Sequence, residues 1–260
     1  MTNPIVIHGI TLTQSQFDTV YNALSFGFAC MLASTIYLYI SQARVLPKYR
    51  QAIAISATVT LIALYHYWRI FDSFVAAKVT GEFNEAYRYV DWLLTVPLLL
   101  METIAVLNLP GGQRKSLISK LVPASALMIV LGYPGEITAD TTPKMVWGAL
   151  STIPFLYILY VLFVELTKSL DSQPGEVAAT VKRLRLLLIA TWGVYPISFL
   201  LPVLLNDPTG GGAGGFVGRQ VGYTIADVLA KCLFGLTIYK IARLKSAADD
   251  PSYAASEGVH

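Results

Sequence analysis

The sequence predicts an all-α membrane protein of seven transmembrane helices, with the N-terminus outside the cell and the C-terminus in the cytoplasm. Three observations predict this fold: the composition, a set of seven apolar segments, and the charges between the segments. Of the 260 residues, 55% are hydrophobic and only 13% are charged. A soluble domain normally carries about 25% charged residues. The composition is therefore typical of a chain that crosses a lipid bilayer several times.

The seven apolar segments are separated by short connections rich in proline and glycine. Each segment is near or above the roughly 20 residues that a helix needs to span a bilayer. They lie at residues 15–40, 50–74, 86–108, 118–134, 144–167, 182–206 and 218–244. The connection at residues 76–87 is longer than the others and could hold a short hairpin. We expect residues 1–246 to form one transmembrane domain and the polar residues 247–260 to be a disordered tail.

Charges in the connections predict the orientation. Basic residues collect in the first, third and fifth connections and after the seventh segment, whereas the intervening connections are acidic. The positive-inside rule then places the first, third and fifth connections and the C-terminal end in the cytoplasm. Only an odd number of helices allows this alternation when the C-terminal end is basic and the N-terminus is not. The charges therefore support seven spans independently of hydropathy, and a multi-pass protein of the cell membrane.

Composition also excludes several classes of function. The net charge of +3 is small, and no basic stripe suggests a nucleic-acid partner. The two cysteines, Cys30 and Cys232, give neither a disulfide framework nor a metal motif, so no metal is expected. Residues 1–16 lack a basic region followed by an apolar core, so we expect no cleavable signal peptide.

The most informative residue is a lysine inside the seventh apolar segment. Lys231 lies in the stretch at residues 221–239, and Asp227 precedes it by one helical turn. Ionisable groups inside a membrane are expensive and are functional candidates by default. A desolvated lysine can form a Schiff base with an aldehyde. The segment therefore predicts a covalently bound chromophore or substrate in the middle of the membrane.

The third apolar segment carries a second set of ionisable residues, Arg88, Asp91 and Glu102. Asp91 and Thr95 are four residues apart and share a helix face. Asp91 and Glu102 are separated by roughly three turns, or about 16 Å of helix, and face the same direction. With the predicted orientation, Arg88 is outermost and Glu102 is nearest the cytoplasm. The pattern indicates a column of proton-carrying groups. Arg88 alone could instead reach the interface, and Glu102 could be a structural carboxyl.

Other positions have both a functional and a purely structural interpretation. His66, in the outer half of the second segment, is either a packing residue or a partner that sets when Asp91 takes up a proton. Trp192, Tyr195 and Pro196 form an aromatic cluster beside a kink-prone proline, which is often simply core. Gly148 is normally read as a small residue that allows two helices to pack closely.

Four segments, in order, resemble the microbial rhodopsins, and proton-pumping proteorhodopsins and xanthorhodopsin-like proteins in particular. They are RYVDWLLTVP, WGALSTIPFLYILYVLF, WGVYP and DVLAK, at residues 88–97, 147–163, 192–196 and 227–231. The resemblance covers nearly the whole chain. It implies a light-driven outward proton pump, an ion transporter and not an enzyme, with all-trans retinal bound to Lys231 as a protonated Schiff base.

The resemblance also implies a role for individual residues. Asp91 would be the primary counterion and proton acceptor, Asp227 the second counterion, Arg88 the gate and Glu102 the proton donor. Thr95 completes the proton-pump triplet with Asp91 and Glu102, and His66 matches the histidine that such pumps pair with the acceptor. The retinal pocket would be formed by Trp92, Leu99, Met128, Gly132, Ser151, Phe155, Trp192, Tyr195 and Pro196, with leucine at position 99 going with green absorption.

Two positions refine the resemblance. Arg219 stands where haloarchaeal pumps carry a carboxylate, which puts a dedicated glutamate release group in doubt. Gly148 stands where many relatives carry tryptophan; a glycine there permits a carotenoid antenna, and both binding and its absence stay open. The resemblance also favours a homo-oligomer.

Two alternatives share parts of this pattern. A photosensory rhodopsin that signals to a membrane partner would have the same fold and chromophore, but it needs no proton donor such as Glu102. A seven-helix transporter or receptor without retinal would use Lys231 only as a member of a structural ion pair.

Overall fold

The computed structural model describes residues 4–107, 109–138, 140–170, 175–205 and 212–258. Within these residues, seven helical stretches are long and apolar enough to cross a membrane, and the predicted all-α fold with seven spans is confirmed. They are Gln14–Arg44, Pro47–Thr80, Ala86–Leu107, Gly111–Ile137, Thr141–Lys168, Gly175–Leu204 and Ala213–Asp249. The expected ends of the third and sixth segments, at residues 108 and 206, lie outside the described residues.

The first five spans each rest on one long helix. These are α1 (Gln14–Ser41), which the short 3₁₀ helix η1 (Gln42–Arg44) extends, α2 (Pro47–Thr80), α3 (Ala86–Leu107), α4 (Gly111–Ile137) and α5 (Thr141–Leu170). The sixth span consists of α6 (Gly175–Trp192) and α7 (Val194–Leu204), which meet at Gly193. The seventh consists of α8 (Ala213–Asp227), the π-helical turn η2 (Val228–Leu233) and α9 (Phe234–Asp249). A π turn widens the helix locally and is common at functional sites.

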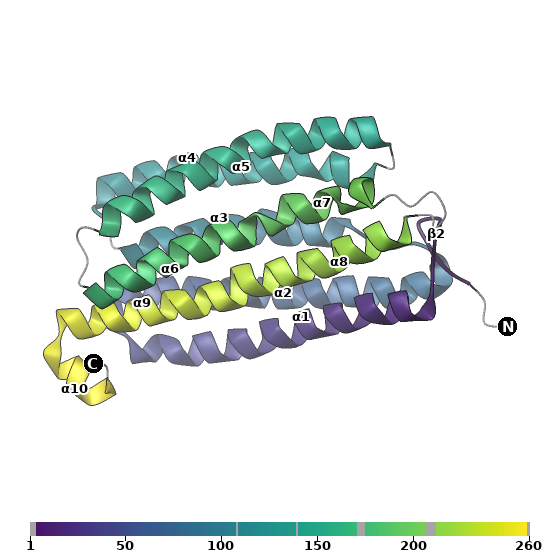
Figure 1. The fold of residues 1–260 in the computed structure, drawn as a ribbon. Helices are drawn as coiled ribbons and strands as arrows, with labels where there is room; N and C mark the ends of the chain where they lie inside the picture. The colour runs from purple at the N-terminus through teal and green to yellow at the C-terminus, as the bar shows by residue number, and fades with distance from the viewer. Residues whose placement is uncertain (1–3, 108, 139, 171–174, 206–211, 259–260) are drawn as a thin grey trace.

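The helices run side by side along one axis (Figure 1). Burial separates them into inner and outer spans. In the most apolar part of each span, 61% of the third and 56% of the seventh are buried, against 22% of the first and fifth. The helices α3 and α8–η2–α9 therefore form the interior of the bundle, where a charged side chain is shielded from lipid.

A β-hairpin lies at one end of the bundle. Strands β1 (Ile5–Ile7) and β2 (Ile10–Leu12) pair antiparallel around His8 and Gly9, which both have positive φ. The backbone N–H of His8 donates to Gly81 O at 2.9 Å. The hairpin that we considered for residues 76–87 is wrong, because α2 continues to Thr80 and ends at the left-handed Gly81. That connection is instead the surface on which the N-terminal hairpin docks.

The opposite end carries the C-terminus. We expected a disordered tail from residue 247, but α9 continues to Asp249 and α10 spans Pro251–Glu257. The Asp250 side chain caps α10 by accepting from the backbone N–H groups of Ser252 and Tyr253. An aspartate followed by proline is a helix-start signal, and it explains the difference. Residues 259–260 lie outside the described part of the tail.

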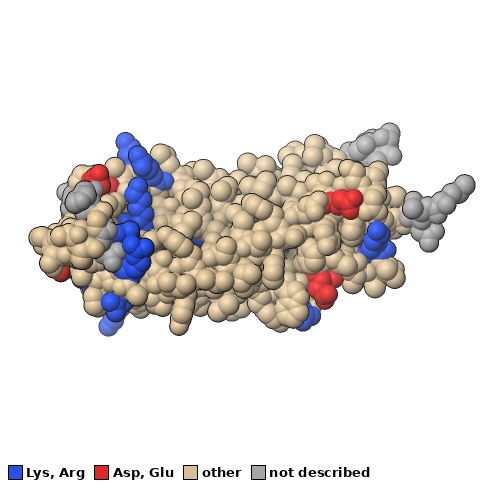
Figure 2. Space-filling model, turned by 90° about the horizontal axis from the view of Figure 1, so that it is seen from below, with Lys and Arg blue, Asp and Glu red and all other residues tan. Residues whose placement is uncertain are grey.

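Charge distinguishes the two ends. On the face in Figure 2, Lys and Arg side chains gather toward the end that holds α10, and the middle is almost free of charge. We call this end the basic end and the other the hairpin end. A long uncharged middle zone fits the hydrocarbon core of a bilayer.

Candidate functional site

The centre of the site is Lys231, on the π turn η2. Its side chain is 1% exposed, and its Nζ lies 2.8 Å from Asp91 Oδ2 and 2.5 Å from Asp227 Oδ1. Asp227 precedes the lysine by four residues, so helical spacing alone brings these two together. Asp91 comes from α3 across the interior. A buried ammonium group is tolerable only when it is paired in this way.

Asp227 has more hydrogen-bond donors around it than Asp91. Besides Lys231, two tyrosines, a tryptophan and an arginine direct hydrogens at it. They are Tyr67 (2.9 Å), Tyr195 (2.8 Å), Trp92 (3.0 Å) and Arg88 (3.3 Å). Four donors in addition to the lysine stabilise a negative charge on this carboxylate.

Asp91 has a much poorer set of partners. Lys231 donates to Oδ2, but Oδ1 is buried and has no hydrogen-bond partner among the described residues. His66 Nδ1 lies 3.7 Å from Oδ1 and 2.9 Å from the carbonyl oxygen of Ile62. Thr95 donates to the backbone oxygen of Asp91 at 2.8 Å and not to its side chain. Asp91 therefore holds its charge mainly through the lysine.

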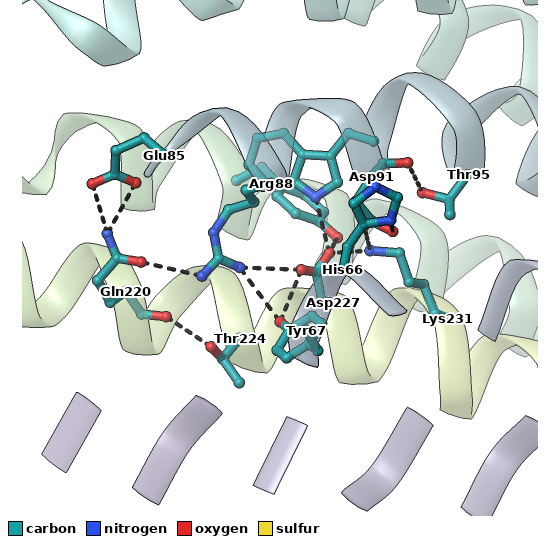
Figure 3. A network of polar contacts seen from close by, with 12 residues as sticks. His66, Tyr67, Glu85, Arg88, Asp91, Thr95, Gln220, Thr224, Asp227 and Lys231 are labelled. Carbon is teal, nitrogen blue, oxygen red and sulfur yellow. Dashed lines mark hydrogen bonds and ion pairs between the residues drawn. The ribbon is translucent and has the colours of Figure 1, made fainter. Parts of the chain in front are cut away.

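Arg88 does not reach an interface. The side chain is 2% exposed and donates to Asp227 on one side and to Gln220 Oε1, at 3.1 Å, on the other (Figure 3). The alternative in which it extends to water is therefore wrong. Arg88 separates the lysine and its carboxylates from the polar groups of the hairpin end.

Glu102 lies toward the basic end and is fully buried. The Ser56 hydroxyl on α2 lies 2.6 Å from Oε2, while Oε1 has no hydrogen-bond partner among the described residues. Glu102 takes part in none of the ion pairs among the described residues. Burying a carboxylate charge without a cation costs far more than burying the neutral acid.

An apolar cavity of about 120 Å³ lies between α3, α4, α5, α6, α7 and α8. Eight of the nine predicted retinal-pocket residues line it, together with Gly148: Trp92, Met128, Gly132, Ser151, Phe155, Trp192, Tyr195 and Pro196. Leu99 is buried in the adjoining core instead. Lys231 does not line the cavity, but Trp92 and Tyr195 do, and both donate to Asp227. The cavity wall is thus hydrogen-bonded to the lysine's partner.

Sequence reasoning missed six residues of the wall: Tyr89, Val96, Ile129, Thr152, Phe199 and Tyr223. Helical spacing could have found two of them, because Val96 is one turn after Trp92 and Tyr223 is one turn before Asp227. Phe199 could not have been found from spacing, because it reaches the cavity through the packing of α7 against α5. Its ring lies so close to Gly148 that a Cβ there would stand 2.8 Å from Phe199 Cε1. Gly148 therefore allows close packing of α5 and α7 as well as bordering the cavity.

Comparison with known proteins gives the family. A family model described as bacteriorhodopsin-like protein matches residues 18–244. The green-light absorbing proteorhodopsin of Gamma-proteobacterium EBAC31A08 is 32% identical over 87% of this chain and 88% of that protein. Bacteriorhodopsin of Halobacterium salinarum is 31% identical over 98% of this chain and 96% of that protein.

The fold agrees with these matches. The solved structure of xanthorhodopsin, described as a light-driven ion pump with dual chromophore, is 46% identical. It covers 92% of this chain and 97% of that chain, with a TM-score of 0.84. The chain therefore belongs to the bacteriorhodopsin-like family of microbial rhodopsins, multi-pass proteins of the cell membrane that include light-driven proton pumps.

Proposed function

We propose that this chain is a light-driven outward proton pump that carries all-trans retinal on Lys231. The observation that carries the proposal is the position of Lys231 Nζ, buried between Asp91 and Asp227 beside an aromatic-lined cavity. When bound as a protonated Schiff base, retinal supplies the absorption of visible light and the change of shape that drives the cycle. The membership of a family with light-driven proton pumps supports the same proposal.

The lining of the cavity suits such a group. A long apolar ligand needs apolar and aromatic walls with few polar groups, and Trp92, Trp192 and Phe155 provide them. Gly132 keeps part of the cavity clear, because a Cβ there would stand 3.2 Å from Ser151 Oγ and 3.3 Å from the Tyr89 ring. The other residues that would hold retinal are Met128, Ser151, Tyr195 and Pro196.

The unequal surroundings of the two aspartates support Asp91 as the acceptor. A proton on Lys231 Nζ can move to Asp91 Oδ2 over 2.8 Å. Asp227 keeps four other donors, which favour its negative charge, whereas Asp91 has no donor besides Lys231 among the described residues and loses fewer hydrogen bonds when it is neutralised. The transfer also removes the charges of Lys231 and Asp91 together, so neither is left buried alone. We assign Asp91 as acceptor and Asp227 as permanent counterion.

Two further residues control that transfer. Arg88 keeps Asp227 paired throughout and closes the way toward the hairpin end, which is the role of a gate. His66 influences Asp91 through space, because the 3.7 Å between Nδ1 and Oδ1 is longer than a hydrogen bond. Its ring orientation is held by the carbonyl oxygen of Ile62.

Glu102 is the proposed donor. It lies on the side of Lys231 that faces the basic end, about 16 Å along α3 from Asp91. Buried without a cation, it can be held as a neutral acid and return a proton to Lys231 Nζ after the first transfer. A sensor needs no such group, so Glu102 favours a pump over a photosensory rhodopsin.

Direction follows from the orientation, which we propose from the positive-inside rule. The basic end would face the cytoplasm and the hairpin end the outside. Protons then enter past Glu102 and leave past Arg88. Self-association into a homo-oligomer stays a prediction.

A carotenoid antenna would be a second pigment against Gly148. Xanthorhodopsin, 46% identical, is described as having a dual chromophore. Gly148 borders the cavity here, and the ring of Phe199 lies against it. A pigment at this position would therefore stack on α5 beside Phe199.

Proton transport by vesicles tests the pump. The chain is reconstituted with retinal into lipid vesicles and illuminated, and the external pH is followed. We expect a light-driven pH change that a protonophore abolishes. Asp91→Asn should remove the pH change. Glu102→Gln should slow the cycle without affecting the first proton transfer, from Lys231 Nζ to Asp91. Asp18→Asn, at an exposed position of α1, is the control. Vigorous pumping by Asp91→Asn would contradict the assignment of Asp91 as the proton acceptor.

A further inference from the structure

Two buried glutamates lie on either side of Arg219 at the hairpin end, and the proposed pump does not yet use them. Arg219 NH2 is 2.7 Å from Glu85 Oε1, and Arg219 NH1 is 3.0 Å from Glu136 Oε1. The three side chains are 10% exposed or less. Arg219 is thus flanked by two carboxylates from other parts of the chain, Glu85 directly before α3 and Glu136 near the end of α4. We call these three residues the exit cluster.

The exit cluster is connected to the centre of the site through Gln220. The Gln220 side chain accepts from Arg88 NH2 at 3.1 Å and donates from Nε2 to Glu85 Oε1 at 3.1 Å (Figure 3). Arg88 in turn donates to Asp227. A continuous chain of polar contacts therefore runs from Asp227 to Glu85. Neither Arg88 nor Gln220 can bind an extra proton: the Arg88 guanidinium is already fully protonated, and the Gln220 amide is not basic.

Glu136 connects the exit cluster to the wall of the apolar cavity. The hydroxyl groups of Tyr89 and Tyr223 donate to Glu136 Oε2 at 3.2 and 3.0 Å. Both tyrosines also line that cavity. The second glutamate is thus held in a fixed position by donors on α3 and α8.

Water can reach the exit cluster from the hairpin end. A cavity of about 560 Å³ is lined by Glu85, Glu136 and Arg219, together with His8 and Lys144. The Lys144 Nζ donates to backbone oxygens of Gly135 and Glu136 and faces the same space. A polar cavity of this size is large enough for several waters.

The charges of the exit cluster suit it to take up one proton. Arg219 has two carboxylate partners, so protonation of one leaves the guanidinium paired with the other. A single ion pair would lose its charge balance and leave a buried cation alone, which is strongly unfavourable. The shared arginine therefore makes transient protonation of Glu85 or Glu136 inexpensive.

We propose that Glu85 and Glu136 form the proton exit site of the pump, with Arg219 as the residue that positions them. A proton that leaves Asp91 toward the hairpin end binds to one of the two carboxylates. That carboxyl then passes the proton to water in the cavity and returns to its ion pair with Arg219. The proposal rests on the proposed function.

Flash-induced proton release tests the exit site. The retinal-loaded protein is excited with a short flash while a pH indicator follows the medium, and absorbance follows the first transfer to Asp91. The variants are Glu85→Gln, Glu136→Gln and the double variant, and Glu82→Gln is the control at an exposed position of the same end. Because a positioned base speeds proton transfer by about a hundredfold or more, we expect the double variant to delay release at least tenfold, with the first transfer unchanged.

Two further measurements distinguish a lost base from lost packing. Glu136→Asp keeps a carboxyl that can accept a proton and should restore release, whereas lost packing alone would also disturb the first transfer to Asp91. Light-minus-dark infrared spectra should contain a transient carboxyl band that disappears in Glu136→Gln or Glu85→Gln. A coloured double variant that releases its proton at the wild-type rate overturns the exit site alone. Absence of any light-driven pH change in the wild type overturns the pump itself.

Discussion

The Ser56 hydroxyl oxygen lies 2.6 Å from Glu102 Oε2 and 3.2 Å from the carbonyl oxygen of Ala52. A hydroxyl group has one hydrogen, so Ser56 can donate to only one of these two oxygens. Both contacts are full, unshared hydrogen bonds only when Glu102 carries a proton and donates it to Ser56, which then donates to Ala52. The geometry therefore favours a neutral Glu102, which is the state that a proton donor needs at rest.

Removal of the Ser56 hydroxyl tests this relationship. In Ser56→Ala the Glu102 carboxyl loses its partner, and a buried polar group without a partner costs about 1–3 kcal/mol. We expect the carboxyl C=O stretch of Glu102, seen in light-minus-dark infrared spectra, to move to higher frequency. Ser56→Thr keeps the hydroxyl and should leave the band near its wild-type position. An unchanged band in Ser56→Ala would show that the hydrogen bond is absent.

The two aspartates should differ in their effect on stability. Asp227→Asn removes the charge that faces Lys231 and Arg88 together, and breaking a buried ion pair costs about 3–5 kcal/mol. Asp91→Asn leaves Lys231 paired with Asp227 and should cost less. Thermal melting of the coloured protein at neutral pH measures the difference. Equal melting temperatures for the two variants would contradict the unequal roles that we assign.

The cap of α10 gives a prediction on pH. Hydrogen bonds from the Ser252 hydroxyl and backbone hold the pKa of Asp250 below its usual range. A carboxyl with a lowered pKa stabilises the folded state above its unfolded pKa of about 3.9, and this contribution is lost as the pH falls through the lowered value. We expect α10 to fray below about pH 4 and in Asp250→Ala at any pH. The rate of hydrogen exchange of the Tyr253 amide measures this fraying. Protection that persists in Asp250→Ala would exclude the cap.

Sequence patterns predicted the fold and the centre of the site because those features depend on local spacing. Lys231 and Asp227 meet through helical periodicity, and the apolar segments follow from composition. Contacts between helices were less predictable. Thr95 bonds to a carbonyl one turn earlier on its own helix, a common choice for threonine in helices, and not to the Asp91 carboxylate.

The hairpin end shows most clearly which contacts the sequence could not predict. Glu85 and Glu136 lie at the edges of apolar segments. In the sequence they therefore served only as acidic residues of the connections, which predict the orientation. In the structure both are buried and paired with Arg219 from α8. Only the packing of α4 and α8 against the connection before α3 brings these residues together, and no spacing within one segment encodes it.

Gly148 decides between an antenna and plain helix packing. A tryptophan at this position would collide with Phe199, since even a Cβ would stand 2.8 Å from that ring. In Gly148→Trp we expect loss of energy transfer from an added carotenoid, measured as the carotenoid band in the action spectrum of proton transport. The retinal band should remain, with a small shift because Gly148 borders the cavity. Ala149→Trp, at the neighbouring exposed position of α5, is the control and should keep the carotenoid band. Wild-type protein without any carotenoid band in this spectrum would contradict the antenna and leave Gly148 as a contact for Phe199.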